Sequence, residues 1–521
     1  MFHGMKLKSS TSANVRHALV ITILVAGLSL AFQARKGLNL WDEGFLWYGV
    51  QRVLMGEVPL RDFMSYDPGR YYWGAAILSL IGDSGIISLR WALAAFQGLG
   101  LFFALCLIAY EMEGSKKKDF VFLLLCAIAL VFWMFPRHKL FDISISIFLI
   151  ALITFLVRKP VPLRYFSVGL GVGFIAIFGR NHGVYGLLAC SGAALWVAYQ
   201  AKGEVSLGRA ICLLGSGIIV GYLPLILMVA FVPGFAASFW ESVWFLFEQK
   251  ATNITLPIPW PWTVDPKSLS TAETVRFVVV GLLFIGVAAF AAASLGWVVI
   301  KGKRGERVSP VLVAAAFLAV PYAHYAYSRA DVGHLAQGIF PLLVGCLIAI
   351  SSLGGAKKWL LVGLLTGGSI WITHIYHPGW VCRAGGDCVS VQVGGDRLTI
   401  EPNTASGIDM MRRLVNELVP EGQVFIVTPF WPGIYAVMNT RSPLHGIYMT
   451  LPQSSQYQQR EINRISELKP QLIVVMDIGL DGRDDLRFRN AQPEIYDFIV
   501  RNFNAFDADG VPDQFRIFTG R

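Results

Sequence analysis

Two adjacent carboxylates, Asp42 and Glu43, follow directly after an apolar run that is typical of a membrane-spanning helix. They lie in the stretch NLWDEGFLWYGVQRVLMGEVPLRDFMSYDPGRYYW, which is rich in aromatic side chains and arginines. Neighbouring carboxylates in a partly dry site raise each other's proton affinity into a range that is useful for proton transfer. We therefore interpret Asp42 as a general base that Glu43 helps to tune. The alternative is that Asp42 only caps the following helix and that Glu43 only favours its dipole.

The stretch that carries the two carboxylates has the spacing of a short helix over residues 42–57. Its aromatic side chains suit the interface between membrane and water, which predicts a helix lying on the bilayer surface. Several aromatic and cationic side chains in and after this helix are candidates for contacts with an acceptor or substrate. They are Tyr48, Arg61, Arg70 and Tyr71.

Cationic side chains recur at three predicted external helix ends, in the segments PRHKLFDIS, GRNHG and SRADVGHL. The positive-inside rule disfavours cations on that side of a membrane. Since the planar guanidinium fork suits phosphate, we predict that these groups bind the phosphate of a substrate. The candidates are Arg137, Lys139, Arg180, Arg329 and His334, and Asp142 opens the helix after the first segment.

Two alternatives remain for these segments. The cations could be interface anchors or could form salt bridges at helix ends. The histidines His138, His182 and His334 could instead bind a metal with Asp142 or Asp331, but tight ligand spacing is missing from the sequence. We therefore predict no metal and no other cofactor.

Composition places the chain in a membrane. Its 521 residues are 55% hydrophobic and only 15% charged, whereas a soluble domain is about a quarter charged. A span needs roughly 20 apolar residues, and about eleven such segments are predicted. They cover residues 17–34, 86–110, 120–135, 141–157, 165–178, 183–200, 210–232, 275–300, 309–326, 335–353 and 359–376.

The basic residues predict the orientation of the chain. The net charge is +10, and short basic segments occur near residues 6–8, 117, 160, 304 and 356. By the positive-inside rule these segments and the N-terminus face the cytoplasm, so the charge is no sign of nucleic-acid binding. An odd number of spans then places the C-terminal region on the external side.

We predict two domains. Residues 1–376 form a polytopic α-helical membrane domain with long external loops at 35–85 and 233–274. Residues 377–521 form an extracytoplasmic α/β domain, in which helices alternate with short apolar strands in a small, mostly parallel sheet. Trp431 and Tyr435, between two of the strands, are candidates to stack on the acceptor. The alternative is that this domain is a stabilising lid that plays no part in the choice of acceptor.

Two of the seven cysteines, Cys382 and Cys388, lie in the predicted external domain. An oxidising compartment would allow them to close a small disulfide loop. The alternative is two unpaired thiols. The other five cysteines lie in apolar spans and are predicted to be small core residues.

The order of these features resembles the GT-C glycosyltransferases, in particular the branch of protein O-mannosyltransferases and lipid A aminoarabinose transferases. The resemblance rests on the acidic pair Asp42–Glu43 after the first span, the segment Pro68–Trp73, and Arg90 at the start of the second span. Asp142 resembles the second acidic position of the family. The match covers the order of elements over roughly the first 200 residues.

The resemblance implies a GT-C fold with about eleven transmembrane helices. It implies transfer of a sugar from a polyprenyl-phosphate donor to an extracytoplasmic glycan, lipid or protein by inverting displacement, in a bacterial inner or plasma membrane. Asp42 would act as the base, with Glu43 and Asp142 orienting or tuning it. The alternatives are a lipid-linked sugar transporter, which would need charges along a full membrane path, and a non-catalytic sensor.

Overall fold

The computed structural model describes residues 9–112, 116–200, 205–249 and 253–521. The chain forms two compact units. The first, which we call the membrane unit, comprises Met1–Phe32, Arg90–Phe231 and Thr252–Trp380. The second, which we call the α/β unit, comprises Gln33–Leu89, Val232–Ala251 and Val381–Arg521. The basic segment predicted at residues 6–8 lies outside the described residues.

Among the described residues, six helices are long and apolar enough to cross a bilayer. They are α1 (Ser9–Gln33), α4 (Ile86–Glu111), α6 (Leu140–Arg158), α12 (Thr271–Lys303), α13 (Pro310–Ser328) and α16 (Gly355–Thr373). The short helices η1 (Arg137–Lys139) and η3 (His374–Tyr376) adjoin α6 and α16. Two further apolar helix pairs are bent, α9 (Leu207–Gly221) with α10 (Leu223–Phe231) by 53° and α14 (Val332–Gly338) with α15 (Phe340–Ser351) by 56°.

Counting each bent pair as one span gives up to eight spans in the described chain, so the predicted number of eleven is not confirmed. The other three predicted spans form α5 (Lys116–Phe132), α7 (Pro162–Phe178) and α8 (Arg180–Tyr199). A helix of 17 residues, such as α7, is about 26 Å long, which is less than the roughly 30 Å of a hydrocarbon core. The helix α8 carries Arg180, Asn181 and His182 in its first turn.

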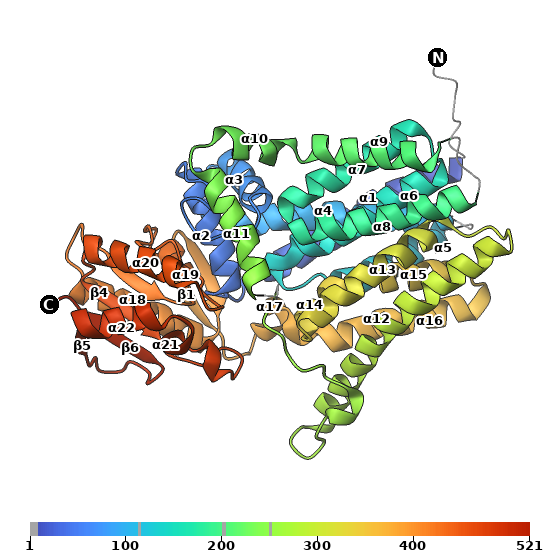
Figure 1. Ribbon diagram of the computed structural model, residues 1–521. Coiled ribbons are helices and arrows are strands. Elements are labelled where there is room, and N and C mark those ends of the chain that lie inside the picture. Colours follow the sequence, from blue (N-terminus) through green and yellow to red (C-terminus); the bar gives the residue numbers. More distant parts are fainter. Residues whose placement is uncertain (1–8, 113–115, 201–204, 250–252) are drawn as a thin grey trace. The chain divides into compact units, whose positions relative to one another are not determined.

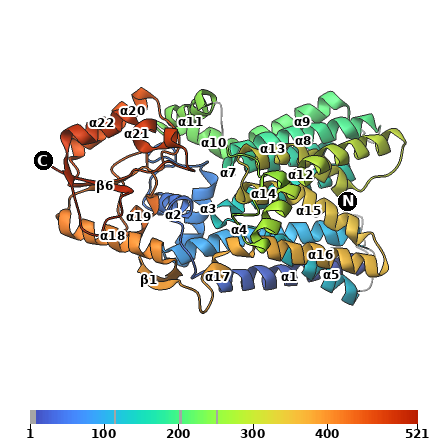
Figure 2. The same cartoon turned by 90° about the horizontal axis from the view of Figure 1, so that it is seen from below.

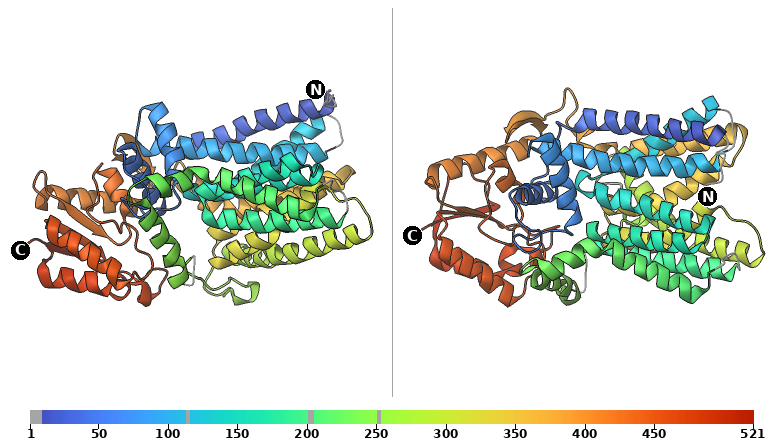
Figure 3. Two further views of the ribbon diagram at one scale, coloured as in Figure 1. Left: turned by 45° about the horizontal axis from the view of Figure 1, so that its top comes forward. Right: turned by 90° about the horizontal axis from the view of Figure 1, so that it is seen from above.

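Close helix packing in the membrane unit depends on small residues. A Cβ atom on Gly169 of α7 would lie only 2.1 Å from the carbonyl oxygen of Leu214 in α9. Small residues let two backbones approach in this way. Figures 1 and 3 show the long helices of this unit running side by side. In α6, buried residues lie on every side of the first turns, so Asp142 faces protein.

The α/β unit contains a four-stranded sheet in the order β3-β4-β6-β5. The strands are β3 (Phe425–Thr428), β4 (Leu472–Met476), β5 (Asn504–Phe506) and β6 (Phe515–Thr519). The pair β3–β4 is parallel, with Phe425 opposite Leu472, whereas β4–β6 and β5–β6 are antiparallel. The prediction of a mostly parallel sheet was therefore wrong. A short loop joins β5 to β6, and such a connection makes the two strands antiparallel.

Helices cover both faces of this sheet. They are α18 (Pro402–Leu418), α19 (Pro432–Val437), α20 (Ser455–Leu468), α21 (Phe488–Ala491) and α22 (Pro493–Asn502). Figure 2 shows α18 and α22 on opposite sides of β6. Ile473 and Val475 of β4 pack against Ile465 of α20 and Ile495 of α22 in one hydrophobic core. The predicted extracytoplasmic domain is thus a three-layer α/β structure.

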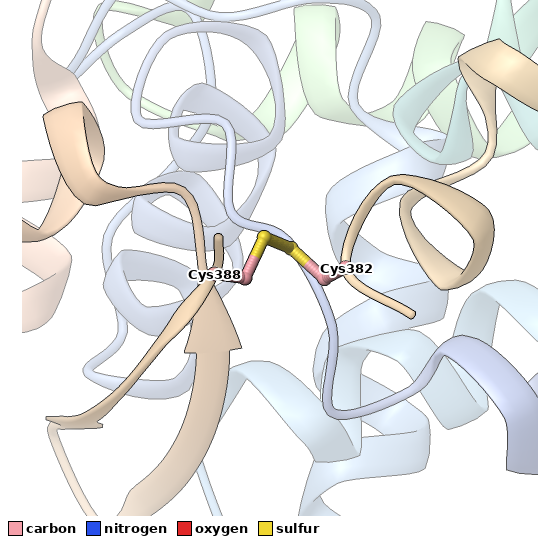
Figure 4. The surroundings of a disulfide bond; sticks show 2 residues. All are labelled: Cys382 and Cys388. Carbon is pink, nitrogen blue, oxygen red and sulfur yellow. A yellow bond between two sulfur atoms is a disulfide. The ribbon is translucent and has the colours of Figure 1, made fainter. Parts of the chain in front are cut away.

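A hairpin of β1 (Val389–Val393) and β2 (Asp396–Ile400) precedes α18. Its β2 strand also pairs with the chain that follows α1, because Gly37 N donates to Thr399 O over 2.8 Å. Just before β1, Cys382 and Cys388 are joined by a disulfide, with the two sulfurs 2.03 Å apart (Figure 4). The hairpin thereby ties the first loop to the C-terminal part of the chain.

Three helices from the two long loops complete the α/β unit: α2 (Asp42–Leu54), α3 (Gly69–Ile81) and α11 (Phe235–Gln249). The inner side of α11 contacts the C-terminal region, where Glu241 forms an ion pair with Arg460. Its Trp240, Trp244 and Phe247 are exposed. An exposed aromatic face of this kind suits the membrane–water interface.

Candidate active site

The predicted site residues divide between the two units. In the α/β unit, Asp42 and Glu43 form the first turn of α2. The side chain of Asn39 caps this turn, since Asn39 Oδ1 accepts from Trp41 N (2.8 Å) and Asp42 N (2.9 Å). The alternative in which Asp42 is the capping residue is therefore wrong.

The Asp42 carboxylate contacts the C-terminal region of the chain. The Tyr448 hydroxyl donates a hydrogen bond to Asp42 Oδ1 over 3.1 Å. The Tyr448 ring packs against Phe45 of α2, with the ring centroids 5.1 Å apart. Glu43 beside it is buried, and its Oε2 accepts from Asn39 N over 3.4 Å. Both carboxylates are thus held by protein groups at the start of α2.

The four aromatic residues predicted to contact the acceptor are core residues. Tyr48, Tyr71 and Tyr435 are at most 1% exposed, and Trp431 is 8% exposed. The hydroxyl of Tyr48 accepts from Ser442 N, and that of Tyr71 accepts from Tyr66 N, each over 3.0 Å. Burial also raises the pKa of the Tyr48 and Tyr71 hydroxyls. A ring enclosed by protein cannot stack on a sugar, so the prediction for these four residues is corrected.

Tyr435 shows what such a residue does instead. Its ring stacks on Phe425, and its hydroxyl accepts from Val427 N over 2.8 Å. Since β3 lies at the edge of the sheet, this hydroxyl satisfies a strand N–H that has no neighbouring strand. Edge strands of this kind are commonly protected by such covering groups.

We predict that Tyr435→Phe lowers thermal stability and leaves both substrate KM values unchanged. The change leaves the buried Val427 N–H without its hydrogen-bond acceptor, which costs about 1–3 kcal/mol of folding free energy. The measurement is the unfolding midpoint of the purified protein, together with the KM of each substrate. Tyr496→Phe, another tyrosine of the same unit, is the control. A raised acceptor KM with an unchanged midpoint would restore Tyr435 as a binding residue.

The two candidate arginines of the first loop have contacts of their own. Arg61 forms an ion pair with Asp62 (2.8 Å) and donates to Pro233 O over 3.3 Å. The guanidinium of Arg70 lies 5.3 Å from the centroid of the Tyr66 ring, and Arg70 is buried. Arg61 thus links the two long loops, and Arg70 belongs to the aromatic packing next to α3. Their predicted contacts with substrate stay a prediction.

In the membrane unit, Asp142 belongs to a buried chain of polar groups. Asp142 Oδ1 lies 2.6 Å from His182 Nε2, and His182 Nδ1 lies 2.9 Å from the Tyr322 hydroxyl. A carboxylate can only accept, so Nε2 carries the hydrogen when Asp142 is ionised. The three residues come from α6, α8 and α13. They join the first turns of α6 and α8 to the later part of α13.

This junction gathers most of the predicted phosphate ligands at one end of the membrane unit. Arg137 and Lys139 form η1, directly before α6, and Arg180 opens α8. Arg329 follows the last residue of α13. Because the ends of these helices meet around Asp142 and His182, the four cations belong to the same end of the bundle.

Arg329 and His334 share one carboxylate. Asp331 Oδ2 accepts from Arg329 Nε over 2.7 Å, and Asp331 Oδ1 accepts from the backbone N of His334 over 2.7 Å, capping α14. Burial alone would raise the pKa of Asp331, but hydrogen bonds from His334 and Arg329 outweigh it and lower this pKa to about 2. The ionised Asp331 thereby fixes the direction of the Arg329 side chain. The predicted role of both partners in phosphate binding stays a prediction.

An apolar pocket of about 460 Å³ adjoins these groups. Pro136, next to Arg137, and Ala330, next to Arg329, both contribute to its wall. The remaining lining residues are Phe135, Pro259, Phe277, Val280, Asp331, Val332, Gly333 and Tyr376. The pocket therefore offers an apolar surface beside the loops that carry two of the cations.

Solved structures share this architecture. The structure of ArnT from Cupriavidus metallidurans bound to undecaprenyl phosphate matches 97% of this chain and 97% of its own, with a TM-score of 0.53 and 13% identity. The apo state of the same protein matches 98% of each chain, with a TM-score of 0.52 and 13% identity. The chain has the GT-C fold.

The GT-C fold and the C-terminal α/β domain confirm the fold class that the sequence predicts. The archaeal oligosaccharyltransferase AglB from Archaeoglobus fulgidus also matches, over 98% of this chain and 76% of its own, with a TM-score of 0.48 and 12% identity. No family model and no curated protein sequence matches the chain.

Sequence reasoning missed several residues that shape this site on the GT-C fold. Asn39 was not singled out, although an Asx residue shortly before a helix is a known capping signal. Tyr448 is not among the predicted site residues, and Tyr322 lies within an apolar span whose composition does not distinguish it. Within residues 9–112, 116–200, 205–249 and 253–521, no group of three or more His, Cys, Asp or Glu residues could hold a metal ion.

Proposed function

We propose that the chain is an integral membrane glycosyltransferase that moves a sugar from a polyprenyl-phosphate donor to an extracytoplasmic acceptor. One observation carries the proposal. Asp42 lies on a helix just after the first span, the helix is capped by Asn39, and the carboxylate is held by Tyr448. A carboxylate oriented in this way suits a general base.

The proposed reaction is an inverting displacement. The Asp42 carboxylate takes the proton of an acceptor hydroxyl, whose oxygen forms a bond to the anomeric carbon of the sugar. The bond between that carbon and the phosphate oxygen breaks on the opposite face, and the lipid phosphate leaves with the electron pair. Glu43 and Asp142 support the base or orient the substrate. No metal and no cofactor takes part in this scheme.

The cations of the membrane unit supply the second half of the proposal. Arg137, Lys139, Arg180 and Arg329 belong to one end of the helix bundle and bind the phosphate of the donor. Arginine forks aimed at an oxyanion stabilise the negative charge that develops on the leaving group. Asp331 orients Arg329 before the donor arrives, which lowers the entropy that binding must overcome.

The apolar pocket suits the first isoprene units of a polyprenyl chain. Its walls are mostly hydrocarbon and aromatic, and it adjoins the loops of Arg137 and Arg329. Small-molecule sites are typically apolar with a few polar groups. The neighbouring structure of ArnT contains undecaprenyl phosphate, which supports a donor of this class for the present chain. We place the reaction at the external leaflet of a bacterial inner or plasma membrane.

The test is transfer of a radiolabelled sugar from a polyprenyl-phosphate donor by the purified, full-length protein in detergent or vesicles. Candidate acceptors are extracts of envelope glycans, lipids and proteins. Transfer that depends on the protein supports the proposal. Failure to consume any such donor, with all acceptor classes present, would contradict it and would favour a transporter or a sensor.

Within this assay, we predict that Arg180→Ala raises the donor KM about tenfold or more, because a hydrogen bond to a charged group contributes roughly 1.5–3 kcal/mol. The acceptor KM should change less than twofold. Arg180→Lys should restore little where the contact is bidentate. The control is Arg304→Ala, an exposed arginine after α12. An unchanged donor KM in the Arg180, Arg137 and Arg329 variants would make these residues interface anchors.

A further inference from the structure

The C-terminal region and the first loop enclose the start of α2 together. Gly433 N donates to Leu40 O over 2.9 Å, and the rings of Trp41 and Phe430 stack 5.2 Å apart. A Cβ atom on Gly44 would lie 2.5 Å from the Cα atom of Gly433. The two backbones therefore touch through glycine. The turn that carries Asp42 is built by two segments about 390 residues apart in the sequence.

Tyr448 reaches Asp42 from this enclosing segment. Its hydroxyl is 3.1 Å from Asp42 Oδ1. Its ring is held by Phe45 at 5.1 Å, and Phe45 in turn packs edge-on against Tyr66 at 5.0 Å. Phe45 lies three residues after Asp42, so the two side chains share one side of α2. The packing of the Tyr448 ring thus fixes the position of its hydroxyl next to Asp42.

A carboxylate on an exposed helix turn has several rotamers of similar energy, and only some point a lone pair at a substrate. A hydrogen bond from a fixed phenol selects one of them. At this helix end the Asp42 N–H donates to Asn39 Oδ1. The Tyr448 hydroxyl donates to Asp42 Oδ1 and so favours one orientation of the carboxylate.

We propose that Tyr448 is a positioning residue for Asp42, so that the C-terminal α/β domain completes the active site of the transferase. This inference rests on the proposed function, since it assigns Tyr448 to the same base. Tyr448 does not exchange protons with the substrate. It holds the Asp42 carboxylate in the orientation that accepts the proton of the acceptor hydroxyl.

The experiment measures sugar transfer by the full-length Tyr448→Phe variant, which keeps the ring contact with Phe45 and loses only the hydroxyl. We expect kcat to fall about tenfold or more, with both KM values and the thermal midpoint unchanged. In an Asp42→Asn background, the same change should alter the residual rate less than twofold, because residues that act as a unit are not additive. Tyr496→Phe, on α22, is the matched control.

The outcomes separate this inference from the proposed function. If the wild-type protein transfers no sugar, both fail. If the wild type transfers sugar and Tyr448→Phe keeps its kcat, only the role of Tyr448 is overturned. A raised acceptor KM with unchanged kcat would also overturn it, because Tyr448 would then bind substrate and not position the base. A kcat loss of the same size in the Asp42→Asn background would likewise remove the link between the two residues.

Discussion

Asp42→Asn should lower the rate of sugar transfer by about 10²–10⁴-fold, because that is the usual contribution of a positioned general base. Asparagine has nearly the same shape and still accepts the hydrogen bond from Tyr448, but its amide cannot take up a proton at neutral pH. The cap from Asn39 does not involve the Asp42 side chain. We therefore expect the variant to insert and fold as the wild type does.

The measurement is single-turnover transfer by the purified variant, compared with its thermal midpoint. Asp497→Asn is the matched control, since Asp497 is an exposed carboxylate on α22 of the same unit. It should transfer sugar at the wild-type rate. An Asp42→Asn protein that retained more than a tenth of wild-type turnover would show that another group takes the proton. Glu43, the buried neighbour, would then be the first candidate.

The sequence predicted the elements of the fold better than their pairing. The predicted alternation of helices with short apolar strands is present, because α18, β3, α20, β4, α22 and β6 follow one another in this order, with shorter elements between some of them. Strand β5 gave no signal, since all three of its residues are exposed. Without β5, the direction of β6 could not be inferred, and the alternation of helices and strands wrongly favoured a parallel sheet.

The span count shows a second limit of hydropathy. A run such as 335–353 has the composition of one span, but the structure breaks it into α14 and α15 with a bend of 56°. The break lies between Gly338 and Phe340, and Pro341 follows in the first turn of α15. Proline lacks a backbone N–H and clashes with the preceding turn, so it disfavours a continuous helix. Composition over a window of about 20 residues does not register the position of one proline.

Site residues could be predicted where neighbouring residues in the sequence carry the signal. The prediction failed where the role of a residue depends on packing between distant segments. Asp42 could be identified because it forms an adjacent carboxylate pair with Glu43 directly after an apolar run, which is visible in the sequence itself. The contact of Asp42 with Tyr448 joins residues 406 positions apart, and no spacing rule reaches that far. Tyr435 and Trp431 were misjudged because an aromatic-rich segment between strands has the same composition in a core as on a binding surface.

Asp142→Ala should destabilise the membrane unit by about 1–3 kcal/mol, the usual effect of leaving a buried hydrogen-bonding group without its partner. Asp142 and His182 are both at most 1% exposed. The substitution leaves the His182 Nε2–H without its partner at 2.6 Å and weakens the junction of α6, α8 and α13. The expected result is a clearly lower unfolding midpoint of the purified protein in detergent.

A double-mutant cycle makes this prediction specific. If the two residues act as a pair, adding His182→Phe to Asp142→Ala should cost much less than His182→Phe costs alone. Thr154→Val is the matched control on α6, because the buried Thr154 hydroxyl has no hydrogen-bond partner among the described residues. The unfolding midpoint of this variant should barely move.

Asp142→Asn keeps an acceptor oxygen for His182, so it should restore most of the lost stability. If Asp142→Asn then still transfers sugar slowly at a normal midpoint, Asp142 serves the chemistry as well as the fold. An Asp142→Ala midpoint equal to that of the wild type would instead show that the buried pair contributes nothing to holding the three helices together.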